Sequence, residues 1–271
     1  MRPPRRQVPV TIAVLGSGGL LTLGATPASA ATASKQVFGG ATRPDQNPIV
    51  LTVRGRRVVR LSTFHRSPCG PWTRTWRPNA SISAGGRFTI EFEGVGTGPD
   101  GEMAFWEERV VGRIRGGSAT GIASVSMRAR NAEGEEYVAA VRWTARHQPG
   151  RVFSGATSQG LGVVVALSAD REVIDTMHVA YTASCRTGGR ITIGELFRDF
   201  TVTRGRLGED RRYTIDLGDG REVVLVVRVA GRIARGRTAS GTLRITVTYE
   251  RADDSIEDVC TTPDIRWTAE S

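Results

Sequence analysis

The stretch TLRITVTY, residues 242–249, alternates polar and apolar side chains without a break. Because successive side chains of a β-strand point to opposite faces, this period of two predicts a strand with one buried and one wet face. The stretch ASVSMRAR, residues 123–130, has the same pattern. Turn residues Gly218-Asp219-Gly220 separate two further strand-like runs and predict a β-hairpin. Residues 195–200 predict one short helix. The fold class expected is therefore all-β, with antiparallel strands in sandwich or barrel-like domains.

Several motifs occur twice, in the same order and at a nearly constant offset. The matching pairs are Val37–Thr42 with Val152–Thr157, Cys69 with Cys185, Gly112–Ile114 with Gly231–Ile233, Ala119–Gly121 with Ala239–Gly241, and Arg142–Ala145 with Arg266–Ala269. Self-similarity of this kind indicates that one structural unit has been duplicated. We therefore expect two tandem antiparallel β-domains, residues 36–147 and 151–271, joined by a short linker at residues 147–150.

Residues 1–30 have the pattern of a secretory signal peptide. Arginines open the chain, an apolar run follows at residues 10–23, and small residues at 26–30 suit a signal peptidase. The apolar run is too short for a membrane span. We expect cleavage after Ala30 and general secretion rather than the twin-arginine route. The mature chain should lack a transmembrane segment and be secreted, extracellular or loosely associated with the cell envelope.

The chain is basic, with 37 Lys and Arg against 27 Asp and Glu and a formal net charge of +10. A surface of this sign suits anionic partners. Lys35 is the only lysine, and the arginines are scattered among apolar residues, as on the wet face of a sheet. We therefore expect no nucleic-acid partner. An anionic cell-wall glycan is the partner class that the charge would suit.

The three cysteines predict one disulfide and one thiol. Exported proteins pass through oxidising surroundings, and Cys185 and Cys260 fall in the same predicted domain, so we expect them to be bonded. Cys69 matches Cys185 in the repeat but has no partner in its own copy. It is predicted to be a buried, unpaired thiol in a monomer, with a Cys69–Cys69 dimer as the alternative.

The most suggestive stretch for binding is CGPWTRTWR, residues 69–77. Exposed Trp72 and Trp76 could stack on sugar rings, while Arg74 and Arg77 could hold an acidic substituent. The alternative is a loop folded over an open end of the domain, with the Trp side chains as its plug. Trp143 and Trp267 differ from this pair, because both lie in repeat-matched final strands, and we expect both to be core residues.

Catalytic motifs are absent from the sequence. The three histidines, His65, His147 and His178, have no metal-binding spacing, and no nucleophile elbow or phosphate-binding loop occurs. The acidic cluster at residues 253–258 lacks a calcium-loop pattern and is expected to be a solvated loop. We therefore expect no catalytic residue, no metal and no cofactor, and a non-catalytic binding or structural role. A hydrolase with an unrecognised site is the alternative, which a pocket lined by converging carboxylates or by His65 would favour.

The strand that begins at Phe153-Ser154-Gly155-Ala156-Thr157, the mid-domain Cys185 and the closing Arg266-Trp267-Thr268-Ala269 strand resemble uncharacterised secreted β-domains of actinobacterial type. The resemblance covers most of the second copy and, more weakly, the first, which lacks the second cysteine. It implies an exported β-fold and carries over no functional residue.

Overall fold

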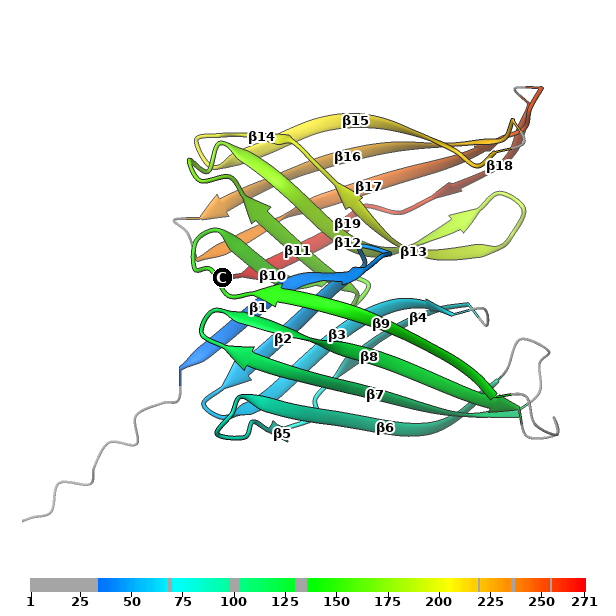
Figure 1. Ribbon diagram of the computed structural model, residues 1–271. Coiled ribbons are helices and arrows are strands. Elements are labelled where there is room, and N and C mark those ends of the chain that lie inside the picture. Colours follow the sequence, from blue (N-terminus) through cyan, green and yellow to red (C-terminus); the bar gives the residue numbers. More distant parts are fainter. Residues whose placement is uncertain are drawn as a thin grey trace, which may run out of the picture. The chain divides into compact units, whose positions relative to one another are not determined.

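The computed structural model describes residues 34–67, 70–97, 103–129, 136–218, 220–234, 237–253 and 255–271. These residues form two antiparallel β-sheets and no helix (Figure 1), so the all-β prediction is confirmed. The predicted signal peptide and Cys69 lie outside the described residues.

The first sheet contains the strands up to Arg146. They are β1 (Lys35–Arg43), β2 (Pro48–Arg54), β3 (Arg57–Ser67), β4 (Gly70–Trp76), β5 (Ala80–Ser81), β6 (Arg87–Thr97), β7 (Met103–Arg115), β8 (Ser118–Ala129) and β9 (Glu136–Arg146). Their order is β4-β3-β2-β1-β9-β8-β7-β6, with β5 paired to β3.

The second sheet contains the strands from Val152 onward. They are β10 (Val152–Thr157), β11 (Gly162–Leu167), β12 (Val173–Cys185), β13 (Arg190–Phe197), β14 (Phe200–Thr203), β15 (Arg206–Asp216), β16 (Glu222–Ala234), β17 (Thr238–Glu250), β18 (Ile256–Thr261) and β19 (Ile265–Glu270). Their order is β11-β10-β19-β17-β16-β15-β14-β12-β13, and β18 pairs with β12 and β17.

The two sheets have the same strand order and the same register. Gly40 pairs with Ile49 and with Ala145, and the equivalent Gly155 pairs with Val163 and with Ala269. β18 is the exception, because it has no counterpart among the described strands of the first sheet. Since Cys260 lies on β18, this added strand accounts for the missing second cysteine of the first copy.

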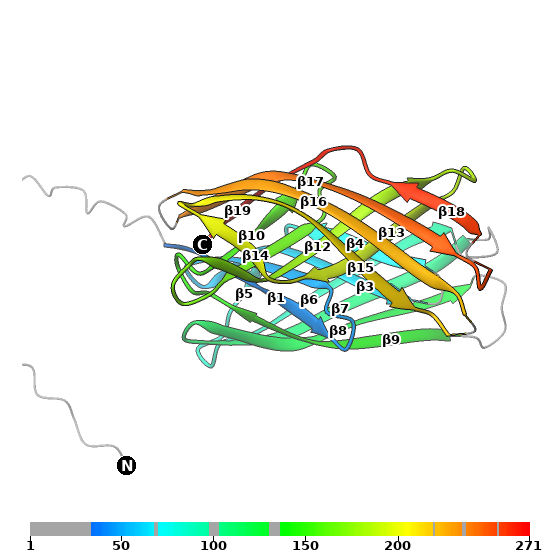
Figure 2. The same ribbon diagram turned by 90° about the horizontal axis from the view of Figure 1, so that it is seen from above.

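The sheets differ in how they close. In the second sheet β12 pairs with both β11 and β14, so the ladder returns on itself as a barrel. In the first sheet β5 pairs with β3, and no ladder between β5 and β6 is found among the described residues, so this sheet is a half-barrel. Figure 2 shows the long strands β15, β16 and β17 curving side by side. Curved, barrel-like sheets are therefore observed rather than face-to-face sandwiches.

Each sheet encloses its own apolar side chains around a tryptophan from its last strand. Trp143 is 1% exposed and Trp267 is 2% exposed, which confirms that both are core residues. The repeat-matched glycines are the reason the rings fit. A Cβ at Gly121 would lie 2.5 Å from Cζ2 of Trp143, and a Cβ at Gly241 would lie 2.9 Å from Cζ2 of Trp267.

The two sheets contact each other through equivalent residues of both copies. Val37 and Val50 of the first sheet cluster with Val152 and Val164 of the second, and all four are buried. The register makes Val37 the equivalent of Val152, and Val50 the equivalent of Val164. The contact therefore has an approximate two-fold axis, and residues 33–271 form one compact unit.

The helix predicted at residues 195–200 is wrong. Phe197 ends β13 and pairs with Met177, while Phe200 begins β14 and pairs with Ile174. Both phenylalanines are buried in the core of the second sheet. Burial of these rings from an extended backbone outweighs the local sequence preference, and Asp199, with a φ of 62°, makes the bend between the strands.

Candidate functional site

The segment predicted as a tryptophan-rich loop is a strand of the first sheet. β4 pairs along its whole length with β3, from Ser67 opposite Gly70 to Leu61 opposite Trp76. Trp76 is half-buried, and its ring stacks on Phe92 with centroids 3.6 Å apart and an interplanar angle of 10°. Since β4 and β6 are the two ends of the open sheet, this stack bridges the opening. Trp76 is therefore packed against β6 and is not a freely exposed ring.

The other three residues of the predicted binding set, Trp72, Arg74 and Arg77, lie on β4 or directly after it. In the ladder Trp72 stands opposite His65, and Arg74 stands opposite Thr63. The side chains of Trp72, Arg74 and His65 lie outside the described part of the structure. Arg77 directly follows β4 and is exposed. The structure thus brings Trp76 and Arg77 to the open side of the first sheet without assembling a described aromatic platform.

The inside of the first sheet carries a buried polar pair that the second sheet lacks. Glu108 is fully buried, and Thr63 Oγ1 donates a hydrogen bond to its Oε1 at 3.2 Å. The register places Val227 and Val179 at the equivalent positions of the second sheet, and both are fully buried in its apolar core. The two copies therefore differ in the chemistry of their interiors at these two positions.

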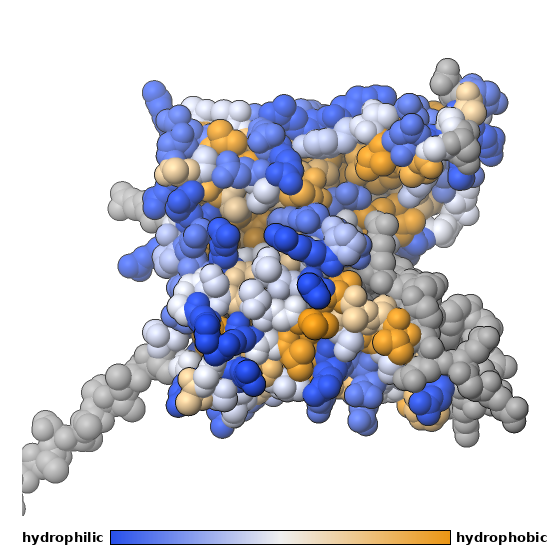
Figure 3. Space-filling view, in the orientation of Figure 1, coloured by the Kyte–Doolittle hydropathy of each residue, from blue (hydrophilic) through white to orange (hydrophobic). Residues whose placement is uncertain are grey.

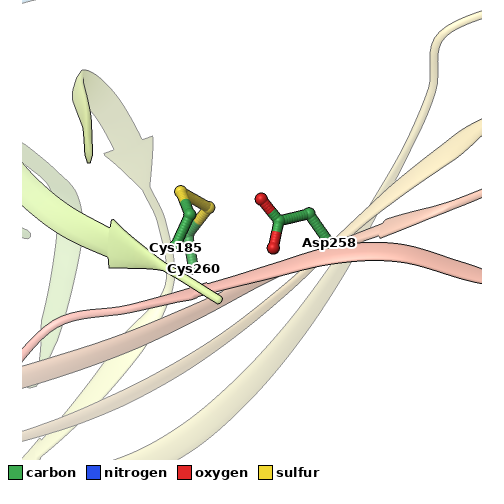
Figure 4. Close-up of side chains that lie close together, drawn as sticks. All are labelled: Cys185, Asp258 and Cys260. Carbon is green, nitrogen blue, oxygen red and sulfur yellow. A yellow bond between two sulfur atoms is a disulfide. The ribbon is translucent and has the colours of Figure 1, made fainter. Parts of the chain in front are cut away.

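The predicted disulfide between Cys185 and Cys260 is present, and it joins the end of β12 to β18 (Figure 4). Asp258 lies beside it, but the sulfur atoms are bonded to each other and so cannot act as thiolate ligands. The Thr187 hydroxyl donates to Asp258 at 2.7 Å, and this bond holds the pKa of the carboxyl below its usual range. Asp258 thus anchors the turn at Thr187, and Glu257 and Asp258 lie in β18 rather than in the solvated loop expected for the acidic cluster. The disulfide indicates an oxidising location outside the cytoplasm.

A surface depression of about 510 Å³ lies over β6, β7 and β8 of the first sheet. Glu93 and Glu107 both line it and stand directly opposite each other in the β6–β7 ladder. Phe105, which is 50% exposed, forms an apolar wall, and Arg128 lies on the next strand. The depression therefore combines two carboxylates on facing strands with an exposed aromatic ring.

A second hollow, here called the basic groove, lies between the two sheets and has a volume of about 420 Å³. Its lining comes from β1, β9, the linker, β10, β11 and β12. Three arginines line it, Arg43, Arg146 and Arg151, against a single carboxylate, Asp175. All four side chains are exposed, and no hydrogen bond or ion pair joins them to any other described residue. Figure 3 shows hydrophilic side chains gathering at the waist between the sheets.

His178 also lines the basic groove and is 8% exposed. Its Nδ1 lies 2.8 Å from the carbonyl oxygen of Gln46, which can only accept, so Nδ1 carries the proton and Nε2 is an acceptor. Burial lowers the pKa of the imidazole below its ordinary value, with a smaller effect of Arg198 in the same direction. The ring is therefore neutral near pH 7.

The approximate two-fold axis creates a related groove of about 360 Å³ on the other side of the contact. There, Glu270 takes the position that Arg146 has in the basic groove, because Glu270 pairs with Ser154 as Arg146 pairs with Gly39. Glu270 forms an ion pair with Lys35. Among the described residues of this related groove, Arg60 is the one remaining cation, whereas the basic groove has three arginines.

Sequence reasoning missed the basic groove. Arg146 and Arg151 flank the linker, but Arg43 comes from the end of β1, far earlier in the chain, so no short motif contains all three. Their position at the ends of repeat-matched strands is the one signal that was present.

No protein-family model matches the chain, and no curated protein matches it. Among solved structures, a candidate outer membrane protein of Bacteroides fragilis matches over 89% of this chain and 98% of that one, with 12% sequence identity and a TM-score of 0.19. A TM-score this low carries no argument about function or location. The described residues include no helix that is long and apolar enough to cross a membrane.

Proposed function

We propose that the protein is a non-catalytic binding or structural protein that acts outside the cytoplasm, either secreted or loosely held at the cell envelope. The observation that carries this proposal is the filling of both sheets. Their interiors are packed with side chains around Trp143 and Trp267, so ligands would meet the outer surface rather than a deep cleft. The Cys185–Cys260 disulfide supports the extracytoplasmic location.

Co-sedimentation with purified cell envelopes tests this function. The mature chain, with its disulfide intact, is mixed with envelopes and with washed beads of an inert polymer as the control surface. We expect retention on envelopes that exceeds retention on the beads and that is released without covalent cleavage. Recovery of the protein wholly in the supernatant at low and physiological salt would count against an envelope-binding role.

Carbohydrate binding through β4, with Trp72, Trp76, Arg74 and Arg77 forming one site, is the alternative binding mode. The position of Trp76 in the sheet decides which variants can test it. Replacing Trp76 would remove the stack on Phe92 and disturb the sheet itself. Trp72→Ala and Arg77→Gln are therefore the informative variants. If both are retained on glycan resin as well as the parent protein, this mode of binding is excluded.

A hydrolase is the second candidate, and the depression over β6–β8 favours it. Residues directly opposite in an antiparallel pair have Cβ atoms about 4.5–5.5 Å apart, which lets two carboxylates approach at the spacing that retaining glycosidases use. Glu93 and Glu107 have this relation. Turnover of aryl glycosides or envelope glycan that is lost in both Glu93→Gln and Glu107→Gln would establish it; equal rates in parent and variants would dismiss this pair.

A further inference from the structure

The basic groove offers positive charge at two separate places along one strand. Arg43 ends β1, whereas Arg146 stands opposite Gly39, four residues earlier on the same strand. At about 3.3 Å per residue, these two positions are about 13 Å apart along the groove. An extended ligand with at least two anionic groups can contact both arginines while it lies along the groove.

The floor of the basic groove suits a chain that lies along it. Gly39, Gly40 and Ala41 of β1 line it together with small apolar residues of the second sheet. Arg43, Arg146 and Arg151 line the same groove beside this uncharged floor. His178, whose neutral ring can accept a hydrogen bond at Nε2, is among the residues that line the groove.

Nucleic acid fits the basic groove less well than a polymer without bases. Proteins that hold single strands stack bases on exposed aromatic rings. His178, itself buried, is the only aromatic residue among those that line the groove in the described part of the chain. Charge without a stacking surface favours anionic groups on a sugar or polyol backbone.

We propose that the basic groove binds an extended anionic polymer of the cell surface, made of sugars or polyols, whose anionic groups contact Arg43 and Arg146 together while Arg151 adds a third contact. This inference rests on the proposed extracytoplasmic binding function and names its ligand class. Arginine forms paired hydrogen bonds with phosphate and with carboxylate, so both kinds of anionic polymer are included.

The test compares an arginine variant of the groove with a matched variant of the outer surface. The groove variant is Arg43→Gln/Arg146→Gln/Arg151→Gln. The control, Arg190→Gln/Arg212→Gln/Arg244→Gln, removes the same charge from exposed arginines of the second sheet for which the structure gives no side-chain partner among the described residues. Circular dichroism and urea unfolding establish that both variants fold like the parent.

Binding is measured by fluorescence anisotropy with three labelled probes of similar charge, poly(glycerol phosphate), oligogalacturonate and oligo-dT. We expect the groove variant to lose at least about 10-fold in affinity for a base-free probe. The slope of log K against log salt should fall by about 2 to 3, since three anion contacts are removed. The control variant should stay within about 2-fold of the parent. The two base-free probes distinguish phosphate from carboxylate.

A third variant, Asp175→Asn, should bind the anionic probes more tightly than the parent, because it removes the one carboxylate that lines the basic groove. We expect affinity to rise by about 2- to 5-fold. Equal losses in the groove and control variants would overturn the proposal, as would tighter binding of oligo-dT that depends on the groove arginines. Envelope co-sedimentation that persists in the groove variant would refute this site while leaving the proposed function standing.

Discussion

Replacing Gly241 by alanine tests the explanation for the duplicated glycine motifs. A Cβ at this position would lie 2.1 Å from the carbonyl oxygen of Ala230, 2.8 Å from the Cα of Gly231 and 2.9 Å from Cζ2 of Trp267. The first two atoms belong to the neighbouring strand β16 and the third to the buried ring. None of them is the free end of a flexible side chain, so the barrel wall itself has to move.

The cost follows from the size of that movement. Ordinary contacts of a Cβ begin at about 3.4 Å, so the Ala230 oxygen would have to shift by more than 1 Å while it stays in its ladder. Overpacking of a well-filled site costs about 1 to 3 kcal/mol. With a backbone atom as the obstacle, we expect Gly241→Ala to lose about 3 kcal/mol of unfolding free energy, which lowers Tm by about 6 to 12 °C.

Gly208→Ala is the matched control. Gly208 stands opposite the same Ala230 from the other neighbouring strand, β15, and a Cβ there meets nothing within 4 Å. Alanine also restricts the unfolded chain more than glycine does, so this variant should be neutral or up to about 1 kcal/mol more stable. Both are measured by urea unfolding of the mature chain with its disulfide intact. Equal midpoints for the two variants would show that the glycine motif does not exist to seat the tryptophan.

Three further predictions concern stability. The Cys185→Ala/Cys260→Ala variant should lose roughly 4 kcal/mol of unfolding free energy, as chain entropy gives for a separation of 75 residues, and an unchanged denaturant midpoint would contradict this. Trp76→Ala should cost about 2 to 3 kcal/mol because the stack on Phe92 is lost, whereas Arg77→Ala, at an exposed site, should stay within about 0.5 kcal/mol; similar losses in both would argue against the stack as the bridge. His178 has a folded-state pKa below its unfolded value, so the unfolded chain binds more protons as the pH falls through about 6.5. Stability should therefore be complete above that pH and decline below it, and His178→Asn should flatten the profile between pH 7.5 and 5.5.

Much of the fold is predictable because it depends on local patterns. The alternation at residues 242–249 is the inward and outward face of β17, where Leu243, Ile245 and Val247 are buried. The repeated motifs predict that the two sheets share one strand register, because residues of these motifs pair with each other across neighbouring strands. Gly241, for example, stands opposite Trp267. The Cys185–Cys260 disulfide could be predicted because the chain has the features of an exported protein and both cysteines lie in the second copy.

What the sequence could not reveal depends on contacts between distant strands. Closure of the second sheet rests on the short pairing of β12 with β14, which leaves no mark in composition. The Pro and polar residues of the segment at 69–77 favour a loop, but residues 70–76 pair with β3 and form a strand. The basic groove could not be predicted because its residues are far apart in the sequence. Arg43 and Arg146 line one groove only once the sheets are folded.

The contact between the copies has a consequence for how they diverged. Gly39 faces its own counterpart, Ser154, and a Cβ at Gly39 would lie 2.0 Å from the Ser154 hydroxyl. Serine therefore fits on one side of the axis only if glycine stands on the other. Two identical second copies could not pair in this way, and two identical first copies would leave a gap. The contact therefore fits one first copy and one second copy better than two copies of the same kind. An excised copy should form a homodimer through this face only weakly, so the same substitution that joins the two halves of one chain also disfavours self-association of either half.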